Sequence, residues 1–258
     1  MKYLKNVFYI LLYLFVFLII QAVMTLLLGN RFILISVSSS ILTLLVFVLL
    51  KWSPFSRDYI RSRPWVAMCW VVILALGTII PSTWLGEQIP YDMPAELKAM
   101  LLDMMHDRWG YLALGILAPL AEEVVFRGAI LRLLLTMFDK RWYWVPIVIS
   151  ALLFGAIHGN LQQFVHASLI GLILGWMYYR TDSIVPGVLF HWVNNSAAYA
   201  ISNLIPGSDD AALIDIFSGD QRAVWLALGF SCCLMFPALF QLYLRLKKAN
   251  EEAAPDVS

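Results

Sequence analysis

Long runs of apolar residues, separated by short polar segments, make up most of the chain. A helix that crosses a membrane needs about 20 mostly apolar residues, and the chain contains about eight such runs. The pattern therefore predicts an all-α polytopic bundle of about eight transmembrane helices. We expect these helices at roughly 7–29, 32–51, 64–86, 109–135, 142–160, 162–180, 183–205 and 222–244.

The composition supports a lipid bilayer as the solvent of the chain. Hydrophobic residues make up 61% and charged residues 14%, and the mean hydropathy is +0.78. A soluble domain would carry about 25% charged residues. The net charge of +1 gives no reason to expect a nucleic-acid partner. The three cysteines lie in apolar runs without metal-type spacing, so we expect them to fill the core.

Lysine and arginine are concentrated in alternate polar segments. If eight helices are threaded in order, most of the basic residues fall on one side and most of the acidic residues on the other. The positive-inside rule then puts both termini in the cytoplasm. We expect the membrane to be a bacterial cytoplasmic membrane, because the loops are short and no organelle signal is present. The basic side holds Lys2, Lys5, Lys51, Arg57, Arg61, Arg63, Arg132, Lys140, Arg141, Arg180, Arg245, Lys247 and Lys248, and the other side holds Arg31, Lys98, Arg108 and Arg222.

One predicted span contains three charged residues in the stretch "EEVVFR". Each ionisable residue in a span costs about 2.5–3.5 kcal/mol on insertion scales, and such residues usually face a cavity or a partner. Glu123 and Arg127 are four apart and share one helix face, so they can pair. Glu122 is turned about 100° away, which leaves it without that partner. Pro119 removes a backbone donor one turn earlier and, in an α-helix, frees the carbonyl of Gly115.

Two later spans add polar groups. "FGAIH" places Phe154 and His158 four apart, and "HWVNN" places His191 and Asn195 four apart. Each signal alone is weak, because a buried ion network can simply fix helix register and a histidine–asparagine pair can join helices at about 1 kcal/mol. Helical rise puts Glu122 about 15 Å, His191 about 12 Å and His158 about 18 Å from the basic side. We therefore expect these groups to converge.

In order, "EEVVFR", "FGAIH" and "HWVNN" resemble the EExxxR, FxxxH and HxxxN motifs of the CPBP family. These are the CAAX-protease and bacteriocin-processing membrane proteases, also called the Abi family, and they include the type II CAAX prenyl proteases. The resemblance covers roughly residues 109–200. It suggests a protease core at 109–205, preceded by transmembrane helices and an outer interfacial segment at 1–108. A last transmembrane helix and a cytoplasmic tail would occupy 206–258.

The resemblance implies a cytoplasm-facing cavity and hydrolysis of a peptide bond near the membrane. In that reading Glu122 activates water with help from His158, and His191 and Asn195 stabilise the oxyanion. Glu123, Arg127 and Phe154 would support the site. The substrate would be a membrane-embedded or lipid-modified peptide or protein, as in CAAX processing or in the maturation of a bacteriocin or signalling peptide.

Several alternatives stay open. Glu122, His158 and His191 could ligate a divalent metal such as Zn²⁺ with water as the fourth ligand, although the family equally allows a metal-free glutamate mechanism. A non-catalytic scaffold or immunity protein with the same fold, or less favourably a transporter, could use the same residues. His166 is expected to be an interfacial or packing residue, and Asn194 could replace Asn195 if the helix is irregular.

Overall fold

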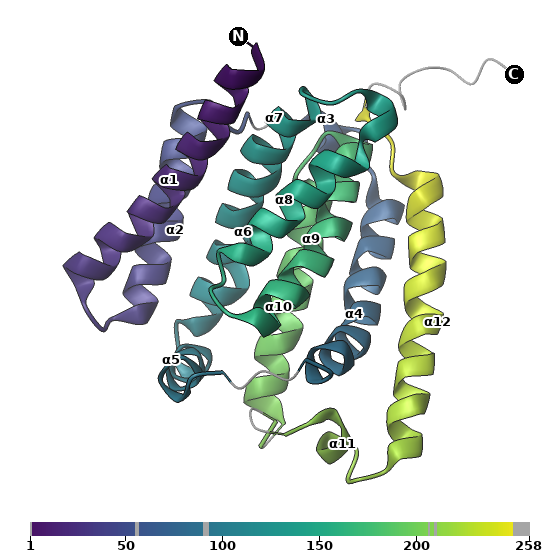
Figure 1. Ribbon diagram of the computed structural model, residues 1–258. Helices are drawn as coiled ribbons and strands as arrows, with labels where there is room; N and C mark the ends of the chain where they lie inside the picture. Colours follow the sequence, from purple (N-terminus) through teal and green to yellow (C-terminus); the bar gives the residue numbers. More distant parts are fainter. Residues whose placement is uncertain (1, 55–56, 90–92, 206, 209–210, 250–258) are drawn as a thin grey trace, which may run out of the picture.

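A computed structural model shows a bundle of long helices (Figure 1). It describes residues 2–54, 57–89, 93–205, 207–208 and 211–249. The predicted tail after 249 and the outer acids Asp92, Asp209 and Asp210 lie outside the described residues. The helical elements are α1 (Lys2–Leu28), α2 (Phe32–Leu49), α3 (Asp58–Arg61), α4 (Trp65–Glu87), α5 (Ala95–His106), η1 (Tyr111–Leu117), α6 (Ala118–Glu123), η2 (Val124–Leu131), α7 (Arg132–Leu135), η3 (Lys140–Trp142), α8 (Trp144–Ala156), α9 (Leu161–Thr181), α10 (Val185–Leu204), α11 (Leu213–Ile216) and α12 (Gln221–Arg245).

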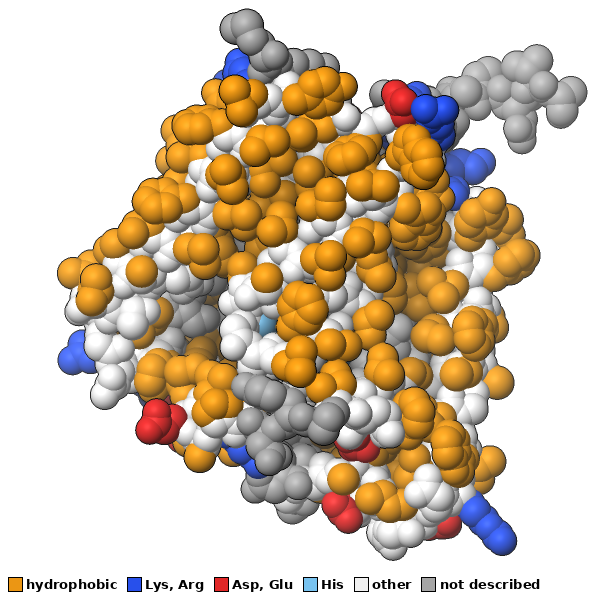
Figure 2. Space-filling view, viewed as in Figure 1, with side chains coloured by type: hydrophobic (Ala, Val, Ile, Leu, Met, Phe, Trp, Pro, Cys, Tyr) orange, Lys and Arg blue, Asp and Glu red, His pale blue; other side chains and the backbone are white. Residues whose placement is uncertain are grey.

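The all-α membrane bundle is confirmed. A helix lies in each of the predicted ranges, because a chain in lipid must satisfy its backbone hydrogen bonds internally. Four helices of the described chain can cross a membrane by length and composition, namely α1 from Tyr3, α2, α4 and α12. Side chains on the visible face are hydrophobic over the middle of the molecule, and charged side chains lie near its two ends (Figure 2).

The helix predicted at 142–160 is shorter than expected. Its regular part, α8, has 13 residues and ends at Ala156. Gly159 then adopts a left-handed φ of +71°, and the Asn160 side chain accepts a hydrogen bond from the Gln163 backbone N–H to begin α9. The left-handed glycine and the following cap therefore turn the chain before the predicted end of the span.

The helix that carries "EEVVFR" is continuous but irregular. η1 and η2 are π-helical, and α6 lies between them with both glutamates at its end. π-helical turns widen the backbone ring by one residue and are frequent at functional sites. The segment is surrounded by neighbours, because every residue of Val124–Leu131 is buried. α6, η2 and α10 therefore form the interior of the bundle, and α1, α2, α4 and α12 lie around it (Figure 1).

The two ends of the bundle differ in their loops. The beginning of α1, the link from α2 to α4, the link from α7 to α8 and the end of α12 lie at one end (Figure 1). We call this the basic end. The other end, which we call the α5 end, carries the α1–α2 turn, α5 and α11 (Figure 1). α5 lies across the bundle at this end, seen almost along its axis in Figure 1.

Candidate functional site

The two adjacent glutamates lie in different surroundings. Glu123 and Arg127 are both fully buried, and Arg127 Nη1 donates to Glu123 Oε1 at 2.8 Å. Arg127 Nη2 donates to the carbonyl of Gly171 on α9 at 3.2 Å. The side chain of Glu122 is 19% exposed. The expected division between a paired and an unpaired glutamate is therefore present.

His191 of α10 lies between the two carboxylates. Its Nε2 is 3.7 Å from Glu122 Oε2, and its Nδ1 is 3.4 Å from Glu123 Oε1. α10 approaches closely because Gly187 has no side chain. A Cβ there would lie 2.7 Å from Glu123 Oε2. The arrangement links both glutamates to one imidazole, which the spacing within a single helix cannot reveal.

The Phe154 ring connects the remaining groups. The Arg127 guanidinium lies over it, with Cζ 4.5 Å from the ring centroid. The rings of His158 and His191 meet it in T-shaped contacts, with centroids 5.2 and 5.7 Å away. One aromatic side chain thereby sets the orientation of a cation and two imidazoles. This explains physically why phenylalanine stands four residues before His158.

His158 lies in the turn after α8 and not within a helix, so the predicted placement in a span is corrected. Its Nδ1 lies 2.9 Å from the Phe154 carbonyl oxygen. A carbonyl only accepts hydrogen bonds, so Nδ1 carries the proton in this contact. In the neutral ring, Nε2 then has a free lone pair with which to accept a proton.

Asn195 compensates for a donor that Pro119 removes. In the π-helical register the N–H of Ala118 bonds to the carbonyl of Ala113, so the next donor in the series would come from Pro119, which has none. Asn195 Nδ2 donates to the carbonyl of Leu114 at 3.0 Å. The carbonyl that Pro119 leaves without a backbone donor is thus that of Leu114, one residue before the Gly115 carbonyl expected from α-helical spacing. The second N–H of the amide is not used by this bond.

A cavity of about 330 Å³ joins these groups. Glu122, His158, His191 and Asn195 all line it, so the structure brings the four predicted catalytic residues together, with Phe154 beside them. Glu123 and Arg127 lie behind the wall and do not line it. The other lining residues are Leu101, Met105, Leu114, Ala118, Gln163, His166, Ala167, Ile170, Asn194 and Ala198.

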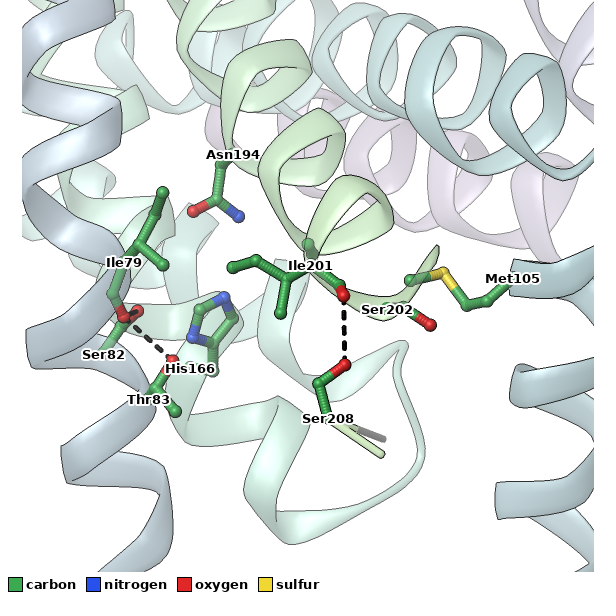
Figure 3. Close-up of a pocket in the computed structure, with 10 residues that line it drawn as sticks. Ile79, Ser82, Thr83, Met105, His166, Asn194, Ile201, Ser202 and Ser208 are labelled. Atoms are coloured by element: carbon green, nitrogen blue, oxygen red, sulfur yellow. Dashed lines mark hydrogen bonds between the residues drawn. The ribbon is translucent and has the colours of Figure 1, made fainter. Parts of the chain in front are cut away.

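Figure 3 shows the residues that line a second cavity, of about 280 Å³, which shares part of its wall with the first. His166 and Asn194 line both cavities, as do Met105 and Ala198. Sequence reasoning assigned His166 to packing and missed its place on the wall. A signal was available, because Gln163, His166 and Ile170 recur at helical spacing on one face of α9.

The suggested zinc ligands do not form a metal site. Within the described part of the chain, no three histidine, cysteine, aspartate or glutamate side chains are grouped so that they could hold a metal ion. Glu122 and His191 approach each other, but His158, although its Nε2 lone pair is free, is not grouped with them as a ligand set. The arrangement of the donors therefore does not fit the suggested three-ligand site.

Comparison with known proteins agrees with the motifs. Residues 105–197 match the Rce1-like family, described as type II CAAX prenyl endopeptidase Rce1-like. The chain is 36% identical over 86 residues to an Escherichia coli protein named "Uncharacterized 24.3 kDa protein", and the match covers 31% of this chain and 38% of that protein. It is 27% identical over 82 residues to "Putative membrane peptidase YdiL" of Bacillus subtilis (strain 168), and this match covers 32% of each chain. The aligned part thus spans about a third of these relatives, and no solved structure matches.

The resemblance to the CAAX-protease family is therefore confirmed over residues 105–197, which contain all three motifs. The match supports a membrane protease of the CAAX type. The division of the chain at 108 and 205 stays a prediction.

Proposed function

We propose that the protein is an intramembrane endopeptidase that hydrolyses a peptide bond of a membrane-associated protein or peptide. One observation carries the proposal: Glu122, His158, His191 and Asn195 come from three separate segments of the chain and line one cavity. Glu122 is partly exposed there, whereas the adjacent Glu123 is sealed in an ion pair. A carboxylate that reaches a cavity beside two imidazoles and an amide has the parts that amide hydrolysis needs.

In the proposed reaction, Glu122 accepts a proton from a water molecule, and the resulting hydroxide attacks the scissile carbonyl carbon. His158 assists with the lone pair of Nε2. The C=O π electrons move onto oxygen to give a tetrahedral oxyanion. When the C–N bond breaks, Glu122 returns its proton to the leaving amine, so that the products are an acid and an amine.

His191 and Asn195 stabilise the oxyanion in this scheme. In this scheme His191 is the imidazolium, whose Nδ1–H faces Glu123 and whose Nε2–H faces Glu122 and the cavity. Asn195 has one N–H free after its bond to Leu114. Both donors act in a largely buried site, where such hydrogen bonds count more than in water. Catalytic contacts often tighten only when substrate binds, which accommodates the 3.4 and 3.7 Å distances.

The test compares new protein N-termini in membranes from cells that make either wild type or Glu122→Gln at equal abundance. The substitution preserves shape and removes the base. Glu96→Gln, the same change at an exposed position of α5, is the matched control. We expect new N-termini in membranes that contain wild type or Glu96→Gln, and we expect them to be missing from membranes that contain Glu122→Gln.

Two results would redirect the proposal. Identical termini, together with rescue of a deletion phenotype by Glu122→Gln, would favour a binding or immunity protein. Substrate flux across sealed vesicles that depends on Glu122 would favour a transporter. Among proteolytic outcomes, termini next to a lipid-modified cysteine would indicate CAAX-type processing, and termini within exported peptides would indicate bacteriocin or signal maturation.

A further inference from the structure

The basic residues mark one end of the bundle. Of the 18 lysines and arginines, thirteen lie at the basic end, four at the α5 end, and Arg127 is buried between them. All the loops are short, and it is over short loops that lysine and arginine set the orientation. The rule therefore places the basic end in the cytoplasm and the α5 end on the opposite face of the membrane.

The cavity extends from Glu122 towards the α5 end only. From the Tyr111–Leu135 helix it is lined by Leu114, Ala118 and Glu122 but by no later residue. From α9 it is lined by residues 163–170, in the half near the α5 end, and from α10 by residues 191–198 in the middle of the helix, from which the second cavity continues to Ser202. No residue of α9 beyond Ile170 and no residue of α10 before His191 lines the cavity, so it lies on the α5-end side of these two positions.

Packed side chains close the path from Glu122 to the basic end. The residues immediately beyond the glutamates on η2 are almost fully buried, as stated above. On α9 Leu174 and Met177 have no exposed surface, and on α10 the same is true of Phe190. These side chains pack between Glu122 and the loops of the basic end, and none of them lines the cavity that contains Glu122.

At the α5 end the cavity walls belong to α5 and to the loop after α10. Leu101 and Met105 of α5 line the first cavity. The second cavity continues past His166 to Ser202 and to Ser208 in the loop after α10 (Figure 3). Ser208 Oγ donates to the carbonyl of Ile201, which ties this loop to α10. The connected cavities thus reach from the glutamate to the loops of the α5 end.

We infer that the site receives its substrate from the extracytoplasmic face, and that the substrate is a polypeptide segment at the outer boundary of the membrane. That the bound polypeptide is a substrate rests on the proposed function. The side of the membrane that the cavity faces does not depend on it. It is opposite to the cytoplasm-facing cavity that the family resemblance implies. The two expectations from sequence, cytoplasmic termini and a cytoplasmic cavity, are incompatible in this fold because they refer to opposite ends.

Thiol labelling tests the sidedness directly. In a background with Cys69, Cys232 and Cys233 replaced by alanine, single cysteines are introduced. Ala198→Cys reports on the wall shared by both cavities, and Leu101→Cys is a second reporter should the first destabilise the fold. Asp139→Cys marks the basic end, where the aspartate side chain is 75% exposed, and leaves every lysine and arginine in place.

A membrane-impermeant methanethiosulfonate is applied to intact spheroplasts and to inside-out vesicles. We expect Ala198→Cys and Leu101→Cys to react in spheroplasts and not in inside-out vesicles, and Asp139→Cys to show the reverse. Reaction of the cavity cysteines from the cytoplasmic face, from both faces, or only after denaturation would overturn the inference. Labelling does not require catalysis. If no new N-termini depend on Glu122, the proposed protease function is refuted, whereas the labelling result still reports which face the cavity opens to.

Discussion

The buried Glu123–Arg127 pair makes a sharp prediction about stability. Arg127→Met keeps an unbranched side chain but removes the charge that faces Glu123 and the donor to Gly171. Breaking a fully buried pair from one side costs about 3–5 kcal/mol because it leaves an uncompensated charge. The equilibrium between folded and unfolded protein would shift by about a hundred- to several thousandfold. That is a large part of a typical total stability of about 5–15 kcal/mol.

The assay measures the thermal midpoint in detergent and the amount of protein in membranes. Arg127→Met should lower both, and Arg141→Met, at a side chain 76% exposed, should change neither. Adding Glu123→Gln to Arg127→Met removes the unpaired charge and should restore part of the lost stability. An unchanged midpoint for Arg127→Met, or a double variant less stable than Arg127→Met alone, would refute the view that the pair exists to neutralise Glu123.

Three further predictions concern the site itself. Gly187→Ala places a Cβ 2.7 Å from Glu123 Oε2 and should reduce both cleavage and the thermal midpoint. Gly229→Ala, whose Cβ would have no atom within 4 Å, should alter neither. Equal effects of the two substitutions would contradict the packing argument. Phe154→Leu loses contacts with both imidazoles worth about 0.5–1.5 kcal/mol each, so the rate of peptide release should fall about tenfold or more at undiminished abundance, and an unchanged rate would remove its positioning role. Cleavage by purified protein should persist after exhaustive chelation, because the described side chains form no metal-ligand set. If chelation abolished cleavage and added Zn²⁺ restored it, the metal mechanism would be favoured instead.

The helices were predictable because their signal is local. Apolar runs of membrane-spanning length give the bundle, and the four-residue spacings give the Glu123–Arg127 pair and the Phe154–His158 contact. The early end of α8 also had a local signal, because glycine followed by asparagine is typical of one helix ending and another beginning. Gly159 and Asn160 thus indicate an end of that span before residue 160.

The rest of the site depends on contacts between distant segments. The π-helical register around Pro119 is accommodated by an amide 81 residues away from the carbonyl that it bonds. His191 reaches both glutamates because Gly187 lets α10 approach them. Which end of the bundle the cavity faces is likewise decided by which halves of several helices pack tightly. No spacing within a single helix contains that information.

The adjacent glutamates show why three charges are retained inside an apolar chain. A single carboxylate could not both pair with Arg127, which keeps it behind the cavity wall, and reach water in the cavity. Two consecutive residues on a helix point about 100° apart, so the sequence can assign one to each task. Glu123 binds Arg127 and lies beside Nδ1 of His191, and Glu122 faces Nε2 of the same ring from the cavity side. If Glu123 is the positioning residue of this pair, Glu123→Gln should reduce the rate at saturating substrate without changing which peptide bond is cut, whereas Glu122→Gln should abolish cleavage altogether. Equal rates in wild type and Glu123→Gln would show that the imidazole is held by other contacts.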